Sequence, residues 1–177
     1  MGSIKKELLS GVFYTAIAKY SGILISLIIT GVLARLISPD KFGIVAVVTV
    51  ITFFFSIFSD LGIGAAIIQN KELQQKDLNQ LFSFTVWSGC ILTLLFFLCS
   101  WPISFFYKEP SMRTITQLLA INLFFASANI VPNALLYKAK AFKFLAWRSL
   151  GVQITGGIIA ILAALGGAGL YALIINP

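Results

Sequence analysis

The chain has 177 residues, of which 59% are apolar and 11% charged, with a mean hydropathy of +0.97. Soluble domains average about 45–50% apolar and about 25% charged residues, so a soluble globular protein is excluded. The net charge of +7 does not require a nucleic-acid partner, because Lys and Arg of membrane proteins concentrate in cytoplasmic loops. The chain has no His, which excludes most zinc sites and Ser-His or Cys-His catalytic sites.

Long stretches without charge predict an all-α, polytopic transmembrane helical bundle. Residues 78–107, 114–137 and 149–177 contain no charged side chain, and about 20 residues suffice to cross a hydrocarbon core. The apolar stretch 12–36 is too long for the h-region of a signal peptide, about 7–15 residues, so we interpret it as the first span. We expect helices at about 12–36, 43–68, 81–106, 115–137 and 149–165, with the start of a sixth at about 170.

The connections between these helices contain helix-breaking prolines and most of the charged residues. "ISPDKFG" (37–43) and "YKEPSMR" (107–113) contain Pro39 and Pro110, which disfavour helix at the preceding residue. "KAKAFKFLAWR" (138–148) mixes cations with aromatic side chains and is expected to lie along the membrane interface. The last apolar segment is too short to span. We therefore expect residues 1–177 to form an N-terminal transmembrane lobe that stops inside its sixth helix, with a second lobe absent.

The distribution of cations predicts the orientation. With the N-terminus inside, the cytoplasmic segments hold eight cations and the outer segments four, which favours a cytoplasmic N-terminus by the positive-inside rule. The inner cations are Lys5, Lys6, Lys71, Lys76, Lys138, Lys140, Lys143 and Arg148, and the outer ones are Arg35, Lys41, Lys108 and Arg113.

Two opposite charges fall inside the predicted spans at similar depth. Lys19 lies about 10 Å from the inner end of the first helix, and Asp60 lies about 12 Å from the inner end of the second, at 1.5 Å per residue. Burying either charge alone would cost several kcal/mol, which pairing reduces. We therefore predict a Lys19–Asp60 pair; Lys19 could instead extend to the inner headgroups.

Polar and small residues recur every three or four positions on three of the helices, so each set shares a helical face. Such faces would be unfavourable against lipid and are expected to line an interior or a wet cavity. Packing between helices is the alternative, especially for the Thr, Ser and Gly positions. The sets are Thr15, Lys19, Gly22, Ser26 and Thr30; Thr52, Ser56, Asp60 and Gly64; and Asn122, Asn129 and Asn133 with Ala126.

Three segments resemble a known family. "LARLISPDKFGIVAVV" (33–48), "SDLGIGAAIIQ" (59–69) and "GGAGLYALII" (166–175) are similar to bacterial polysaccharide flippases, the O-antigen and exopolysaccharide translocases of the multidrug/oligosaccharidyl-lipid/polysaccharide exporter superfamily. The first two segments carry the resemblance, which extends over essentially the whole chain. "FKFLAWR" (142–148) also looks like the inner loop that precedes the fifth helix of this family.

The resemblance implies a fold of about a dozen helices or more in two lobes around a central cavity, working by alternating access in the bacterial plasma membrane. The implied substrate is an undecaprenyl-pyrophosphate-linked oligosaccharide, with membrane lipids and the polysaccharide polymerase machinery as further partners. Lys19 and Arg35 match cavity cations that meet the pyrophosphate, and Asp60 would be their counter-charge or the site of a coupling proton or sodium ion. Ser56, Asn122, Asn129 and Asn133 complete the expected path; no other cofactor is expected.

Three other readings remain open. A cation-coupled drug exporter belongs to the same superfamily, although the turn in "LARLISPDKFG" favours the flippase. A non-transporting membrane subunit could arise from a single lobe. An integral-membrane transferase needs clustered acids to hold a metal diphosphate, and of the six acids only Glu72 and Asp77 lie near each other, in a polar loop. We therefore do not expect an enzyme.

Overall fold

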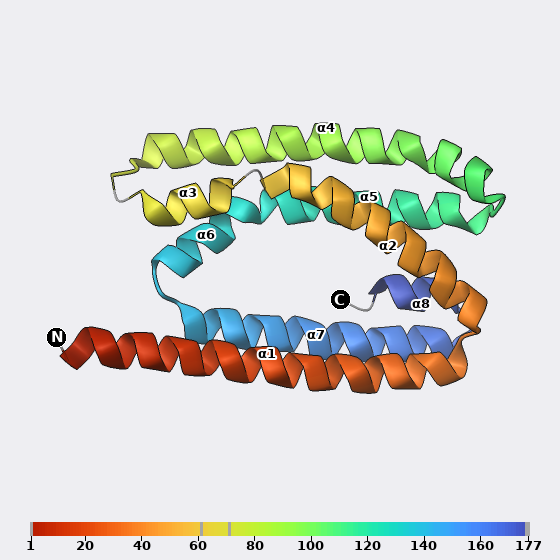
Figure 1. Ribbon diagram of the computed structural model, residues 1–177, viewed down its shortest axis with the longest axis horizontal. Coiled ribbons are helices and arrows are strands. Elements are labelled where there is room, and N and C mark those ends of the chain that lie inside the picture. The colour runs from red at the N-terminus through yellow and green to blue at the C-terminus, as the bar shows by residue number, and fades with distance from the viewer. Residues whose placement is uncertain (1, 61, 71, 176–177) are drawn as a thin grey trace. The chain divides into compact units, whose positions relative to one another are not determined.

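The computed structural model describes residues 2–60, 62–70 and 72–175, and within these ranges every regular element is a helix (Figure 1). Five helical stretches there are long and apolar enough to cross a membrane, which confirms the predicted all-α polytopic bundle. The stretches are Phe13–Leu36, Pro39–Ser59, Gln75–Tyr107, Ser111–Lys138 and Phe142–Leu165. The chain is a multi-pass membrane protein whose contacts divide it into two compact units, residues 1–42 with 139–177 and residues 43–138.

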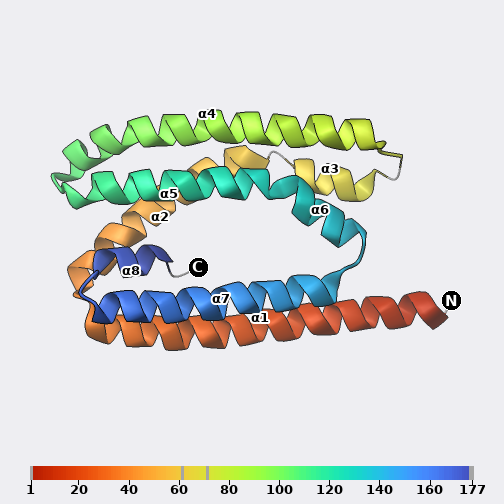
Figure 2. The ribbon, with the colours of Figure 1, turned by 180° about the vertical axis from the view of Figure 1, so that it is seen from behind.

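The first unit is built on two long helices. α1 (Gly2–Leu36) lies beside α7 (Phe142–Leu165), as both ribbon views show (Figure 2). α8 (Leu170–Ile175) packs on α7 and begins where the sixth helix is expected. The core of this unit holds Ile29 and Leu33 from α1, Ile37 directly after it, and Ala160 and Ala172 from the other two helices.

The second unit contains a tight helical pair and a short one. α4 (Gln75–Tyr107) runs beside α5 (Ser111–Ala128), and α3 (Ile63–Gln69) pairs with α6 (Ile130–Lys138). α2 (Pro39–Asp60) begins in the first unit and continues into the second. Its first residue is a proline, which suits the first helical position because no intrahelical acceptor awaits that N–H.

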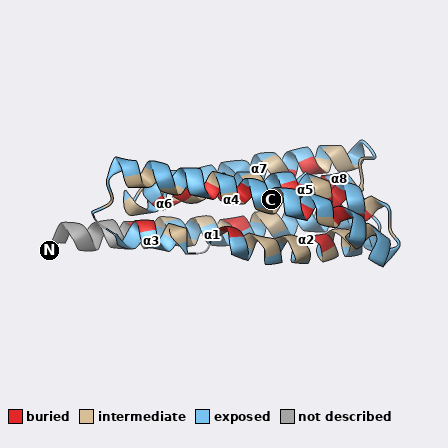
Figure 3. Ribbon diagram, turned by 90° about the horizontal axis from the view of Figure 1, so that it is seen from above, coloured by how far each residue is buried: buried red, intermediate tan, exposed pale blue. Residues whose placement is uncertain are grey.

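Much of the surface of each helix is exposed (Figure 3). Large apolar side chains such as Leu27, Phe53 and Phe105 are among the exposed ones. In water such a surface would promote association, whereas lipid tails cover it at no cost. Small residues are prominent among those that the helices bury, beside large ones such as Phe96: Ala120, Ser127 and Ala160, for example, are fully buried. Small residues let backbones approach closely, which drives helix association in lipid.

Two of the predicted helices are interrupted. The helix expected at 43–68 divides into α2 and α3, because Gly62 adopts a left-handed conformation with φ 75°. Glycine accepts this conformation readily since it has no Cβ. The helix expected at 115–137 divides into α5 and α6 at Asn129. Pro132 explains that division, because its ring lacks an N–H and crowds the carbonyl four residues earlier.

All five expected helices begin earlier than predicted: α1 begins at Gly2 instead of 12, α2 at Pro39 instead of 43 and α5 at Ser111 instead of 115. α4 starts at Gln75 instead of 81, because the Gln74 N–H bonds to Asp77 Oδ2 at 3.0 Å in a capping box. α7 starts at Phe142 instead of 149, so most of the basic aromatic segment is helical. The cations and aromatic side chains of this segment predict a position at the membrane interface, and neither residue type opposes helix formation there.

Candidate functional site

The polar face of α1 is continuous. α1 has no break between Gly2 and Leu36, so Thr15, Lys19, Gly22, Ser26 and Thr30 fall within about 80° of one another at 100° per residue. Lys19 is exposed and lies six residues, about 9 Å, beyond Phe13, where the candidate span begins. The cationic side chain of Lys19 thus projects from within a membrane-spanning segment.

Part of this face serves packing against α7. The Gln153 side chain donates a hydrogen bond from Nε2 to the Gly22 carbonyl at 2.9 Å. A Cβ on Gly22 would approach Gln153 Oε1 to 2.8 Å, so glycine leaves room for this contact. The Thr15 hydroxyl is also occupied, since it donates to the Gly11 carbonyl at 2.8 Å. The packing interpretation therefore holds for Gly22, while Lys19 stands about 60° away around the helix.

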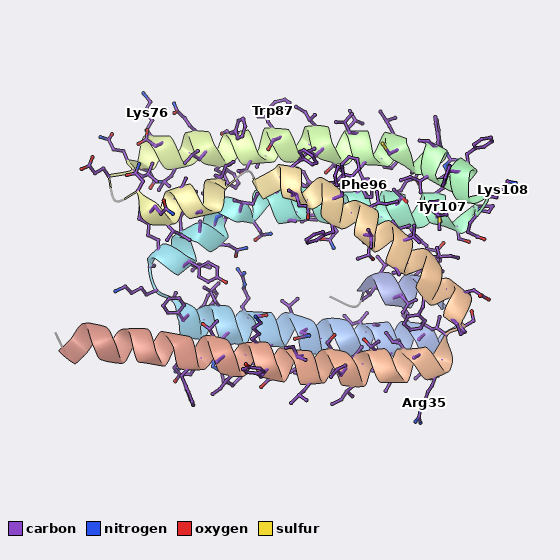
Figure 4. The ribbon with its side chains drawn as sticks, viewed as in Figure 1. Arg35, Lys76, Trp87, Phe96, Tyr107 and Lys108 are labelled. Atoms are coloured by element: carbon purple, nitrogen blue, oxygen red, sulfur yellow. The ribbon has the colours of Figure 1, made fainter. Side chains whose placement is uncertain are left out.

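Arg35 does not share the face of Lys19. Sixteen residues separate them along an unbroken helix, which places them about 160° apart. Figure 4 shows Arg35 pointing away from α7 near the end of α1. Both cations are exposed, but α1 directs them to nearly opposite sides. One ligand on one side of α1 therefore cannot meet both.

On α2, the hydroxyl groups of the predicted stripe are bonded to their own helix. Thr52 donates to the Val48 carbonyl at 2.8 Å, and Ser56 donates to the Phe53 carbonyl at 2.7 Å. Each oxygen keeps its capacity to accept a hydrogen bond. Gly64 no longer continues this face, because the break at Gly62 separates it from α2.

The Asp60 side chain lies outside the part of the chain whose side chains are described. Lys19 and Asp60 also belong to different compact units. The Lys19–Asp60 pair therefore stays a prediction, based on depth alone.

The three asparagines lie along α5 and α6 but differ in surroundings. Asn122 is exposed, and Asn129, at the division between the helices, donates from Nδ2 to the Phe125 carbonyl at 2.8 Å. Asn133 is half-buried and lines an open hollow of about 370 Å³ between α3 and α6. The other lining residues are Gly64, Ala65, Ile68, Ile130, Ala134 and Tyr137.

A buried junction of α2, α4 and α5 was not predicted. Ser127 Oγ lies 3.1 Å from Ser59 Oγ and 2.9 Å from the Leu123 carbonyl oxygen. Both serines are buried, and a Cβ on Gly89 would come within 2.6 Å of Ser127 Cβ. The three helices therefore meet through Ser59, Gly89 and Ser127. Their small size is the signal in the sequence, but it does not say which helices touch.

Aromatic contacts extend this junction toward the end of α4. The rings of Phe55 on α2 and Phe96 on α4 lie 4.8 Å apart, centroid to centroid, and Phe96 is fully buried on the side of α4 that faces α2 (Figure 4). At the turn between α4 and α5, the Arg113 guanidinium lies 5.1 Å from the centre of a Trp101 ring. Among the described residues, no group of three or more Cys, Asp or Glu could hold a metal ion.

Comparison with known proteins relates the chain to cell-surface polysaccharides. A family model described as "Polysaccharide biosynthesis protein" matches residues 32–177. The "Lipopolysaccharide biosynthesis protein WzxC" of Escherichia coli (strain K12) is 28% identical over 158 residues, 89% of this chain and 31% of that protein. The "Teichuronic acid biosynthesis protein TuaB" of Bacillus subtilis (strain 168) is 28% identical over 121 residues, 68% of this chain and 25% of that protein.

A third relative is the "Succinoglycan biosynthesis transport protein ExoT" of Rhizobium meliloti (strain 1021), 23% identical over 81% of this chain and 29% of that protein. The chain thus spans about a quarter to a third of the length of these curated relatives. No solved structure matches. The resemblance predicted from the sequence is confirmed, and because the family model covers most of its length, the chain belongs to the family of polysaccharide biosynthesis proteins.

Proposed function

We propose that the full-length protein moves an undecaprenyl-pyrophosphate-linked oligosaccharide across the bacterial plasma membrane by alternating access. In this proposal residues 1–177 contribute an N-terminal lobe with the N-terminus in the cytoplasm. Two findings support it: membership of the family and five apolar helical stretches of membrane-spanning length. One relative is also named a biosynthesis transport protein.

The observation that carries the proposal is Lys19. An exposed ammonium group on a membrane-spanning helix is costly unless an anion or water receives it. A pyrophosphate carries the complementary charge, and a lysine binds phosphate groups as a point charge. We assign Lys19 the contact with the pyrophosphate. Arg35, which points to the other side of α1, is assigned to the outer headgroup region.

The remaining path residues would contact the sugars and the coupling ion. Ser56 has already donated its hydrogen to Phe53, so its oxygen is available to accept one from a sugar hydroxyl. The amide groups of Asn122, Asn129 and Asn133 can both donate and accept. Asp60 is assigned as the counter-charge of Lys19 in the empty protein, or as the site of a coupling proton or sodium ion.

The test is restoration of surface polysaccharide by the full-length protein in a flippase-deficient cell. Lys19→Ala should reduce the restored polysaccharide about tenfold or more, because tenfold corresponds to losing only about 1.4 kcal/mol of interaction. Lys19→Arg should retain most of it, and Arg35→Ala is the matched control on the opposite face of the same helix. Each variant is compared at equal protein level in the membrane.

Several results would overturn the proposal. Full restoration of surface polysaccharide by Lys19→Ala would show that Lys19 does not contact the pyrophosphate. Equal losses from Lys19→Ala and Arg35→Ala would contradict the proposal that only the Lys19 face of α1 meets the substrate. A wild-type protein that restores no polysaccharide but lowers drug accumulation would indicate the drug exporter instead.

A further inference from the structure

Two neighbouring spans of the second unit are interrupted. α2 and α3 meet at Gly62, whose φ of 75° and ψ of 9° place it in the left-handed region. No heavy atom lies within 4 Å of the position that a Cβ would occupy there. Glycine is therefore required at 62 for its backbone conformation, since there is space for a larger side chain.

The second interruption, at Asn129, keeps more of the helical hydrogen bonding. At Asn129 the backbone N–H lies 3.1 Å from both the Phe125 and the Ala126 carbonyl oxygens, so the hydrogen bonding changes from a four-residue to a three-residue spacing. Three residues later Pro132 cannot donate. A kink of this origin loses little hydrogen bonding when its angle changes, because the bonds around it are already shared.

The two interruptions are adjacent in space. Ser59, three residues before Gly62, meets Ser127, two residues before Asn129, at 3.1 Å between their hydroxyl oxygens. On one side of this contact α2, α4 and α5 pack through Gly89 and the Phe55–Phe96 rings.

Beyond the contact, α3 and α6 have a core of their own. Ile67, Val131 and Ala134 are buried there, with Ile63 packed against them. Leu78 and Leu81 at the start of α4 also touch this core. The chain between α3 and α4 is extended at both Asn70 and Gln74, so this connection can follow a displacement of α3.

We propose that α3 and α6 move as one body about Gly62 and Asn129, while the Ser59–Ser127 contact stays fixed. Both interruptions lie just beyond that contact, so one axis near it serves both helices. The movement carries Asn133 and the hollow between α3 and α6, and it changes the contact with Leu78 and Leu81. The inference rests on the fold of residues 43–138 and does not depend on the proposed substrate.

The test measures distances between spin labels in the full-length protein in lipid bilayers, with its native cysteines, Cys90 and Cys99 among them, replaced by Ala. One pair, Leu118 and Leu135, spans the division between α5 and α6; a second, Phe53 and Ala66, spans the division between α2 and α3. Both distance distributions should be about twice as wide as that of Leu118 and Phe84, which reports on α5 and α4 alone. All five labelled positions are exposed.

Substitutions at the two interruptions then test whether α3 and α6 move about them. Gly62→Ala and Pro132→Ala should each narrow both distributions, because each favours a continuous helix. Gly43→Ala is the matched control: no heavy atom lies within 4 Å of its Cβ position either, but its φ is not positive, so it should change neither distribution.

Equal widths for all three pairs in the wild-type protein would overturn the inference, whether or not the variants fold. So would a wide distribution for one of the two spanning pairs alone, because α3 and α6 would then not move together. Since this readout does not involve transport, its outcome is distinguishable from failure of the Lys19 test.

Discussion

The α4–α5 pair and the α1–α7 pair use glycine in different ways. In the first, the position of a Cβ on Gly89 is 2.6 Å from Ser127 Cβ and 3.8 Å from the Phe124 carbonyl oxygen. In the second, the space beside Gly11, Gly22 and Gly157 is filled by side chains: Phe142, Gln153 and Ile29, respectively. α4 and α5 are thus held at a fixed separation by atoms close to the backbone, whereas α1 and α7 meet through long side chains.

Burial follows the same difference. α5 buries Met112, Ile115, Thr116, Leu119, Ala120, Leu123 and Ser127, whereas α7, a longer helix, buries Ala146, Gly157 and Ala160. Without a hydrophobic force between helices in lipid, close packing and hydrogen bonds decide how firmly a pair associates. We therefore expect the α4–α5 pair to tolerate changes at its contact poorly, and the α1–α7 pair to adapt.

The largest effect is expected at Gly89. Gly89→Ala should lower the unfolding free energy in bicelles by about 2 kcal/mol, because the new methyl group overlaps Ser127 Cβ and the helices must separate. Adding Ser127→Gly should recover part of this loss. Adding Ser127→Ala should not, since alanine retains the Cβ. If Ser127→Gly and Ser127→Ala restore the unfolding free energy equally, the Cβ of Ser127 does not set the distance between the two helices.

A smaller effect is expected at Gly157 in the other pair. Gly157→Ala should cost less than about 1 kcal/mol, because the overlapping atoms, Cδ1 and Cγ1 of Ile29, belong to a side chain that can shift, whereas Gly89 faces a Cβ, and alanine favours the helix. In the Ile29→Ala background, which removes both overlapping atoms, the same change should be neutral or stabilising. A loss as large as that of Gly89→Ala, measured under the same conditions, would contradict the contrast between the pairs.

The smallest effect is expected at the buried serines. Ser59→Ala should cost about 0.6 kcal/mol, a typical value for one hydrogen bond between helices in a membrane. Ser127 limits the cost because its hydroxyl also lies within bonding distance of the Leu123 carbonyl. Thr52→Val is the control, since the Thr52 hydroxyl bonds only within α2. A double-mutant cycle with Ser127→Ala should give a coupling of the same size; no coupling would mean that the serines act separately.

The sequence predicted the positions of the membrane spans better than the breaks within them. Runs without charge locate membrane-spanning helices reliably, because hydrocarbon excludes charges. Gly62 did not reveal the division of α2 from α3, since glycine is also common within membrane helices. Pro132 was a visible signal for the division at Asn129, because no other residue removes a helical N–H.

The candidate site was predictable only in part. The face shared by Thr15, Lys19 and Ser26 follows from helical periodicity, and the same arithmetic sets Arg35 on the other side. The Ser59–Ser127 contact could not be derived, because it depends on which helices pack together and at what height. The Lys19–Asp60 pair depends on the same knowledge, which is why it stays a prediction.

The turn between α4 and α5 bears on biogenesis. The Glu109 N–H bonds to the Ser104 carbonyl at 3.2 Å, and the Ser111 hydroxyl bonds to Glu109 Oε1 at 2.8 Å, so the two helices are connected by a closed and very short loop. Such a hairpin can assemble as soon as both helices have left the ribosome and the insertion machinery. α1 ends at Leu36, whereas its partner α7 begins at Phe142. The α4–α5 hairpin is therefore complete in the growing chain before α7 is made, so α1 can pair with α7 only after that hairpin is able to form.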